Sequence, residues 1–197
     1  MSKKLVIYLP EGFADWEGSF LMPELVQNKK SFVTVSETGN DVLSIGRLKV
    51  KPEAALSSIS IDEIEGLVLI GSDTWSDSSQ NQKVLKLAGD LLKKGTLVAA
   101  ICGATVAMAR EGLLNERNHT SNFLPLLKQL VPAYRGEKNY KNDLAVTDGN
   151  LITASGVGAL EFTMHLMRAL NIYTEEKRQQ WFALYKNGVH PPMEFWS

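Results

Sequence analysis

The sequence predicts an α/β sandwich built around a mainly parallel sheet. Three short apolar runs, at residues 4–9, 66–70 and 96–101, have the continuous hydrophobicity of strands that are buried on both faces. Segments with helical spacing of apolar residues separate these runs, for example at residues 80–94. Because strands that alternate with helices are joined by parallel crossovers, this order of elements favours the α/β class.

The N-terminal part is predicted to contain two strands, a helix and a hairpin. Residues 4–9 (KLVIYL) are rich in β-branched and aromatic side chains and form the first strand. Residues 15–26 have helical spacing, and Pro23 is expected to kink that helix or to end its first part. Residues 31–36 (SFVTVS) form the second strand, and residues 42–50 form a hairpin with a glycine in its turn.

The middle of the chain continues the alternation of strand and helix. Residues 66–70 (GLVLI) form a buried strand. The helix at residues 80–94 is expected to stop at Gly95, which follows two lysines that suit a helix C-terminus. Residues 96–101 (TLVAAI) form the next buried strand, and residues 104–110 form a compact helix.

The C-terminal part is predicted to be a hairpin followed by two helices. Residues 144–146 and 151–154 flank an Asp-Gly-Asn sequence, which is a strong hairpin-turn signal. Residues 159–170 form an amphipathic helix. Thr174 opens a last helix, whose apolar face carries Trp181, Phe182 and Tyr185.

Composition and charge limit the kind of protein. The 197 residues are 44% hydrophobic and 22% charged, which suits one globular domain over residues 1–197. A net charge of −1 gives no indication of binding to nucleic acid or to a membrane surface. The N-terminus lacks the apolar core of a signal peptide, and no run of about 18 apolar residues could cross a membrane. A single cysteine forms no intramolecular disulfide, so we expect a cytoplasmic location.

The single cysteine, Cys102, directly follows the predicted strand at residues 96–101. The small residues 103–105 let the chain turn sharply into a helix, and a nucleophile on such a turn is exposed. The helix N-terminus lowers the pKa of a thiol there. Because parallel strands end at a common rim, residues 11–17 and 71–76 should lie near the cysteine. A buried structural cysteine is the alternative, since free cysteine is among the most buried residue types.

Four segments stand in an order that is known from one protein family. They are LVIYLPEGFADWEG near the N-terminus, GLVLIGSD, AAICGATVAMAREGLL around the cysteine, and DGNLITASGVGALEF. Together they resemble the ThiJ/PfpI superfamily, which includes the parkinsonism-associated protein family and the intracellular proteases. The resemblance implies a three-layer α/β/α sandwich with a mainly parallel sheet, of the class I glutamine amidotransferase-like (flavodoxin-like) type.

The resemblance also implies which residues act with Cys102. Glu17 stands at the position of the family's acidic partner, where a protonated carboxyl would donate a hydrogen bond to sulfur and would need a raised pKa. Asp15 is the other acid nearby, and Glu11, Asp15 and Glu17 could instead simply favour a helix N-terminus. The two backbone amides of the family's oxyanion pocket fall on Gly103 and Ser72.

Two positions depart from the family pattern. Gly103 follows the cysteine where the intracellular proteases have a histidine. Asn122 stands where other relatives supply a histidine from a later loop, and His119 three residues earlier is the remaining candidate. A cysteine–histidine pair is the usual means of activating a thiol, so these departures weaken the case for a hydrolase. His165 and His190 are too far apart in the sequence to make a metal site, and no cofactor is expected.

Three functions remain open from the sequence. The first is a cysteine-dependent hydrolase with protease, amidase or deglycase chemistry on a small-molecule or peptide substrate. The second is a redox-sensing or stress-response protein whose Cys102 is oxidised to a sulfinate. The third is a non-catalytic binding protein that keeps the fold. Residues 72–80 are either a lid over the cysteine or a solvated loop. A homodimer is expected because relatives commonly pair, although the C-terminal aromatic residues could instead cover the core: Trp181, Phe182, Tyr185, Phe195 and Trp196.

Overall fold

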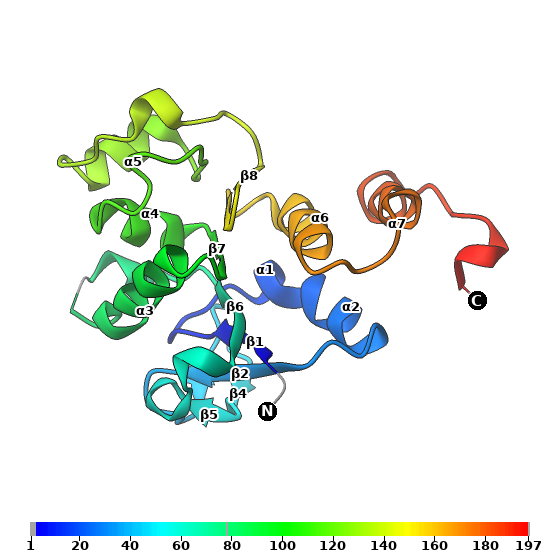
Figure 1. The fold of residues 1–197 in the computed structure, drawn as a ribbon, viewed down its shortest axis with the longest axis horizontal. Coiled ribbons are helices and arrows are strands. Elements are labelled where there is room, and N and C mark those ends of the chain that lie inside the picture. The colour runs from blue at the N-terminus through cyan, green and yellow to red at the C-terminus, as the bar shows by residue number, and fades with distance from the viewer. Residues whose placement is uncertain (1–2, 78, 197) are drawn as a thin grey trace.

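A computed structural model describes residues 3–77 and 79–196 as a seven-stranded sheet with helices on both faces (Figure 1). Residues 1 and 2 of the N-terminal segment lie outside the described residues. The strand order is β5-β2-β1-β6-β7-β9-β8, and all neighbours pair in parallel except β8 with β9. The predicted fold class is therefore confirmed. The strands are β1 (Lys4–Tyr8), β2 (Phe32–Ser36), β5 (Ala54–Ala55), β6 (Ile64–Leu69), β7 (Leu97–Ile101), β8 (Ala145–Asp148) and β9 (Leu151–Ala154).

Side-chain alternation along β1 divides the core into two halves. Val6 and Tyr8 face one side of the sheet, and Leu5 and Ile7 face the other, because successive side chains of a strand point in opposite directions. All four side chains are buried. Helices must therefore cover both faces, which is why the central strands consist of unbroken apolar runs.

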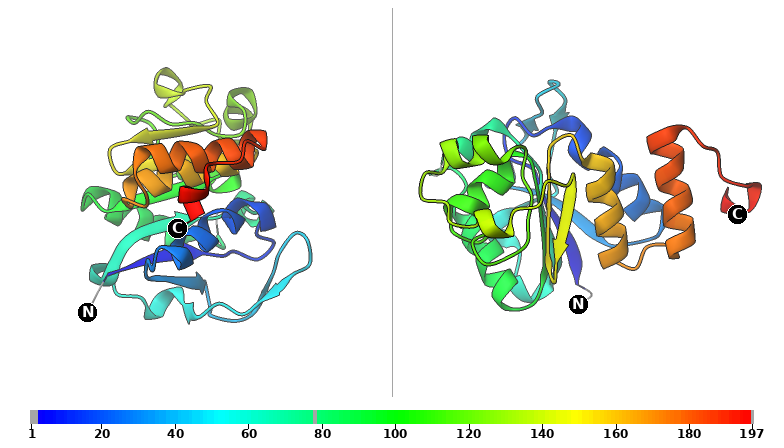
Figure 2. Two further views of the ribbon diagram at one scale, coloured as in Figure 1. Left: turned by 90° about the vertical axis from the view of Figure 1, so that its right-hand side faces the viewer. Right: turned by 90° about the horizontal axis from the view of Figure 1, so that it is seen from above.

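The helices form two layers on opposite faces of the sheet (Figure 2). One face is covered by α3 (Gln82–Lys93), α4 (Gly103–Arg110) and α5 (Leu124–Leu130). The other face is covered by α1 (Asp15–Ser19), α2 (Leu21–Gln27) and α6 (Ala159–Ala169), and α7 (Glu175–Asn187) packs on the outside of α6.

Most of the predicted elements are present, with shifts of one or two residues at their ends. The hairpin of β3 (Val42–Leu43) and β4 (Lys49–Val50) forms a separate two-stranded sheet, as expected. The predicted N-terminal helix is broken at Phe20 into α1 and α2. Pro23 lacks the amide hydrogen that would bond to the carbonyl of Ser19, so the break falls one turn before the proline.

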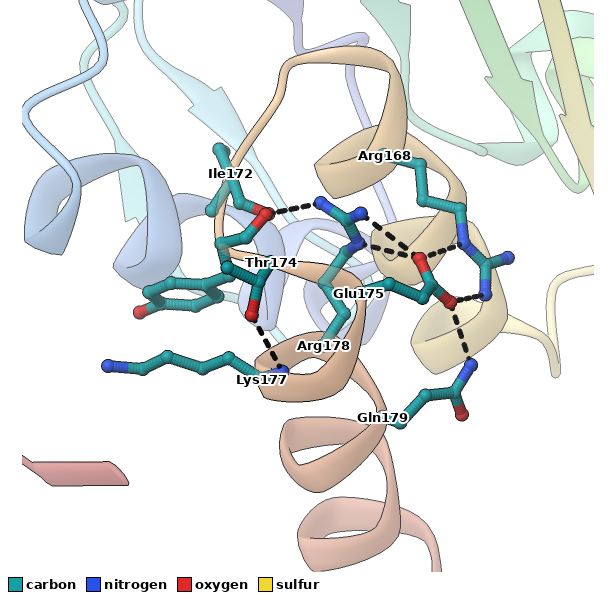
Figure 3. A network of polar contacts seen from close by, with 8 residues as sticks. Arg168, Ile172, Thr174, Glu175, Lys177, Arg178 and Gln179 are labelled. Atoms are coloured by element: carbon teal, nitrogen blue, oxygen red, sulfur yellow. Dashed lines mark hydrogen bonds and ion pairs between the residues drawn. The ribbon is translucent and has the colours of Figure 1, made fainter. Parts of the chain in front are cut away.

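Polar contacts join α6 and α7 at their common turn (Figure 3). Thr174 caps α7 by accepting a hydrogen bond from the Lys177 amide, as its predicted place at the helix start requires. Arg168 at the end of α6 binds the Glu175 carboxylate through Nε and Nη2. Arg178 adds a second cation on the same carboxylate, so charged groups as well as apolar packing hold α7 on α6.

The C-terminal aromatic residues divide between core and surface. Trp181 and Phe195 are buried and cover the core, whereas Tyr185 and Trp196 are about half exposed. Burial in the core therefore accounts for part of the set, and the pairing of two chains stays a prediction. In residues 3–77 and 79–196, no helix has the length and apolar character that crossing a membrane requires.

Candidate active site

Cys102 occupies a strained turn between β7 and α4. Its backbone angles, φ 57° and ψ −125°, lie in a region that side-chain-bearing residues rarely adopt. Such strain costs of order 1–3 kcal/mol and persists only where neighbouring contacts enforce it. Here the Cys102 amide donates to the carbonyl of Ala154 at 3.0 Å, and its carbonyl accepts the Thr105 hydroxyl at 2.6 Å. The turn places the half-buried thiol at the carboxyl edge of the sheet.

Glu17 lies beside the thiol and is fully buried. Its Oε2 accepts a hydrogen bond of 2.6 Å from the Gly71 amide, at the end of β6. Its Oε1 has no geometric hydrogen-bond partner among the described residues, and Cys102 interacts with the same carboxyl. A Cβ atom on Gly156 would lie 2.8 Å from Cys102 Sγ and 3.2 Å from Glu17 Oε1. The carboxyl and the thiol therefore face a common point.

Burial is the largest cause of the pKa shifts of Glu17 and Cys102. It raises the pKa of Glu17 to about 7, although the hydrogen bonds with Gly71 and Cys102 oppose that rise. Burial also raises the pKa of the Cys102 thiol, and the negative charge of Glu17 adds to the rise. Hydrogen bonds from Asn122 and from the Gly103 amide act in the other direction. The helix N-terminus alone would lower the thiol pKa. The thiol pKa is raised instead, so the sequence expectation is wrong on this point.

Asn122, at the position where the family resemblance implies a histidine, contacts the thiol. Its Nδ2 donates to Cys102 Sγ at 3.4 Å, and its Oδ1 accepts the Gly156 amide at 2.8 Å. The Gly156 carbonyl in turn accepts the indole N–H of Trp16 at 2.8 Å. These bonds fix the amide with its nitrogen toward sulfur. An amide donates a hydrogen bond but takes up no proton near neutral pH, so Asn122 orients the thiol and does not act as its base.

A cavity of about 220 Å³ opens beside the thiol. Gly103 and Ser72, the two positions implied for the oxyanion pocket, both line it, and Ser72 has an extended backbone. Trp75 is fully buried and forms part of the wall, with its indole N–H donating to the Ile70 carbonyl. Within the segment at residues 72–80, Ser72 and Trp75 are buried at the cavity, whereas the exposed residues are Asp73, Ser76, Asp77, Ser79 and Gln80. Residue 78 lies outside the described residues.

His119 and Asp15 take no part in this cluster. The His119 ring is buried, with Nδ1 bonded to the Arg117 carbonyl at 2.7 Å and Nε2 to the Tyr134 hydroxyl at 2.6 Å. Burial lowers the pKa of His119, and both of its nitrogens are occupied away from the thiol. Asp15 accepts the Gly46 amide at 2.8 Å and so binds the hairpin. Of the two acids weighed from the sequence, Glu17 is the one that lies beside Cys102.

The sequence did not identify several residues that the structure places in the site. Gly156 and Trp16 complete the hydrogen-bond path to Asn122, and Arg110 lines the cavity. Gly156 follows β9, so the rule that parallel strands end at a common edge could have placed it near Cys102. No group of three or more His, Cys, Asp or Glu side chains within the described part of the chain is arranged to hold a metal ion.

The fold and the site define an α/β protein of the flavodoxin-like type, with a cysteine on a strand-to-helix turn beside a buried glutamate. The DJ-1/PfpI family matches residues 3–169, and the chain belongs to that family. Sequence similarity extends beyond the cysteine turn. A Bacillus subtilis protein named "Uncharacterized protease YoaZ" is 35% identical over 193 residues, covering 94% of this chain and 91% of that protein. Drosophila melanogaster "Protein dj-1beta" is 31% identical over 178 residues, covering 86% and 90%.

Solved structures agree with this assignment. A thiJ/pfpI family protein from Bacillus anthracis has a TM-score of 0.91 at 35% identity, over 100% of this chain and 94% of its own. The structure of Drosophila melanogaster DJ-1beta has a TM-score of 0.75 at 26% identity, over 93% and 96%. The resemblance that the four sequence segments indicate is therefore confirmed.

Proposed function

We propose that this protein is a cysteine-dependent hydrolase of amide or acyl bonds, with Cys102 as nucleophile and Glu17 as its proton partner. One observation carries the proposal: Glu17 is fully buried beside the thiol, with a pKa raised to about 7. A group whose pKa lies near the working pH is best suited to general acid–base catalysis. Glu17 would thus replace the histidine of a cysteine–histidine pair.

The proposed reaction moves one proton back and forth between the two side chains. Glu17 accepts the thiol proton while Sγ forms a bond to the carbonyl carbon of the substrate. The amides of Gly103 and Ser72 stabilise the negative oxygen that results. Glu17 then protonates the leaving group, and water hydrolyses the thioester to release an acid and restore the thiol. The word protease in the name of the Bacillus subtilis relative YoaZ is consistent with this chemistry.

Substitution of the pair tests the proposal. Turnover should be measured on a panel of amide, ester and glyoxal-adduct substrates. Cys102→Ser should abolish turnover, and Glu17→Gln should lower it by about 10²-fold or more, the usual contribution of a general acid–base group. Asp15→Asn is the matched control, because this acid on the same helix binds the hairpin instead. Turnover that survives in Cys102→Ser would exclude a catalytic cysteine.

Oxidation of Cys102 is the second candidate, and the position of Glu17 favours it too. A protonated Glu17 Oε1 could donate to an oxygen added on sulfur, since it has no geometric partner among the described residues. Mild peroxide would convert the thiol to a sulfinic acid, adding about 32 Da for two oxygens. Intact-protein mass spectrometry would detect that gain. Absence of both turnover and this mass gain would instead favour a non-catalytic binding protein.

We also propose that the chain is one domain that forms a homodimer in the cytoplasm. Exposed apolar side chains of the C-terminal segment support pairing, namely Tyr185, Val189, Met193 and Trp196. Such a group of exposed apolar residues is typical of a protein interface. Light scattering coupled to size exclusion would measure the mass in solution. A mass near 21.8 kDa, that of one chain, would exclude the dimer.

A further inference from the structure

The cavity beside Cys102 follows helix α4, and we call it the groove. Cys102, Val106 and Arg110 are spaced four residues apart, so they lie one above another along one side of that helix, and all three line the cavity. The backbone rises about 12 Å between Cys102 and Arg110, at 1.5 Å per residue over eight residues.

Two further segments line the groove. The first lies against the start of α4, because a Cβ on Gly103 would be 2.6 Å from the Ser72 carbonyl oxygen and 3.5 Å from Trp75 Cβ. The side chain of Arg110 reaches back along the helix to this segment, and its Nη1 donates a hydrogen bond of 3.0 Å to the Trp75 carbonyl. The second begins at Asn122, which contacts the thiol, and continues into α5.

Helix α5 gives the groove its apolar wall. Leu126 and Leu130 lie one turn apart, line the cavity and are 39% and 46% exposed. Val106 and Trp75 are buried and complete the apolar surface. The cavity of about 220 Å³ is larger than the engineered apolar cavity of about 150 Å³ that binds benzene.

The guanidinium of Arg110 is a cation in the lining of the groove. It is held by its bond to the Trp75 carbonyl, and no ion pair of Arg110 is present among the described residues. The lining also contains one acid, Asp73, which is exposed. A guanidinium without an ion-pair partner favours a ligand that carries a carboxylate.

We propose that this groove selects the substrate: an acyl compound with an apolar chain of about six carbons that ends in a carboxylate. The carbonyl carbon would lie at Cys102, the chain against Leu126 and Leu130, and the carboxylate at Arg110. This inference rests on the proposed function, because it assigns the acyl group that Cys102 attacks. A cavity of about 220 Å³ accepts an apolar group larger than benzene, which fits a chain of this length.

Alkylation of the single cysteine tests the groove without a natural substrate. Chloroacetamides with N-ethyl, N-hexyl and N-(5-carboxypentyl) groups transfer their carbon to sulfur and release chloride, and the thiol proton goes to buffer. For each reagent, the second-order rate constant for alkylation of Cys102 is measured. It is then divided by the rate constant of unsubstituted chloroacetamide at the same cysteine, which gives a ratio for that reagent. We expect this ratio to rise roughly 16-fold from ethyl to hexyl, about twofold for each of the four added methylenes, since the leucines keep the chain only partly buried. The carboxypentyl reagent should exceed the hexyl reagent.

Substitutions inside the groove and outside it test which side chains cause the differences between the alkylation ratios. Leu126→Ala with Leu130→Ala should bring the hexyl ratio close to the ethyl ratio, and Arg110→Gln should remove the advantage of the carboxylate. Leu48→Ala and Arg47→Gln on the exposed hairpin are the matched controls and should keep the wild-type ratios.

The outcomes distinguish the groove from the proposed function. A reactive Cys102 whose rates show no dependence on chain length, or whose ratios survive the groove substitutions, would overturn the groove and leave the hydrolase standing. Substrate turnover that persists in Cys102→Ser would overturn the hydrolase whatever the ratios show.

Discussion

Replacement of Glu17 by glutamine should lower the pKa of Cys102. The thiol pKa is raised first by burial and next by the charge of Glu17, and the substitution removes only the charge. Because burial raises the pKa of Glu17 to about 7, the carboxylate is charged in the alkaline range where the thiol ionises. The two groups titrate as a coupled pair, so the substitution converts a shared titration into that of the thiol alone.

The size of the effect follows from the geometry. A point 2.8 Å from Cys102 Sγ is also 3.2 Å from Glu17 Oε1, so about 6 Å is the upper limit of the Coulomb distance. At an effective dielectric constant of about 20, two like charges at that distance repel by about 3 kcal/mol. The substitution removes this repulsion, so the pKa of Cys102 should fall in Glu17→Gln.

The assay is the pH dependence of alkylation by iodoacetamide. Cys102 is the single cysteine of the chain, so every alkylation event reports on this site. Asp15→Asn serves as the control and should leave the thiol pKa unchanged. An unchanged pKa in Glu17→Gln would show that the carboxylate is not coupled to the thiol. A higher pKa would show that a protonated Glu17 stabilises the thiolate by donating a hydrogen bond, and would refute the repulsion argument.

Four other predictions concern the same cluster and the fold. Asn122→Ala should raise the pKa of Cys102, because it removes the donor 3.4 Å from sulfur, and the same alkylation profile would show it. Gly156→Ala should slow alkylation of Cys102 at least tenfold, since its Cβ would lie 2.8 Å from Sγ; an unchanged rate would mean that the site relaxes freely. Glu17 binds a proton more tightly in the folded state, with a pKa of about 7 against 4.5 for a free glutamate carboxyl, so the stability that it contributes is present below about pH 4.5 and is lost as the pH rises through 7. The loss amounts to about 3 kcal/mol in urea unfolding, and Glu17→Gln should abolish this part of the pH dependence. Thr174→Ala should lower the free energy of unfolding by about 1 kcal/mol through loss of the α7 cap, whereas Thr174→Ser should retain it.

The sequence predicts the sheet well because its central strands carry their own signals. The strands at residues 4–9, 66–70 and 96–101 are unbroken apolar runs, and burial on both faces requires such runs. Strand β5 was not predicted, since Ala54–Ala55 is a pair of small residues held by pairing with β2. Helix α5 was not predicted either, because it has seven residues and a proline in its first turn.

The site could be predicted only in part, and the missing part depends on contacts between distant segments. The small residues after Cys102 indicate a sharp turn, and the family pattern points to Glu17. No local signal shows that burial raises the thiol pKa, because burial depends on how the surrounding segments pack. The hydrogen bonds that occupy both nitrogens of His119 likewise come from the tertiary structure.

Three glycines decide from which side a substrate can reach the thiol. A Cβ on Gly71 would lie 2.7 Å from Cys102 Cβ, and one on Gly156 would lie 2.8 Å from Sγ, so backbone fills the space on these sides. A Cβ on Gly103 would meet the Ser72 carbonyl at 2.6 Å. The strained turn at Cys102 fixes the thiol within this enclosure. The cavity along α4 lies beside the thiol, so under the proposed function the residues that line it would control the access of a substrate to Cys102.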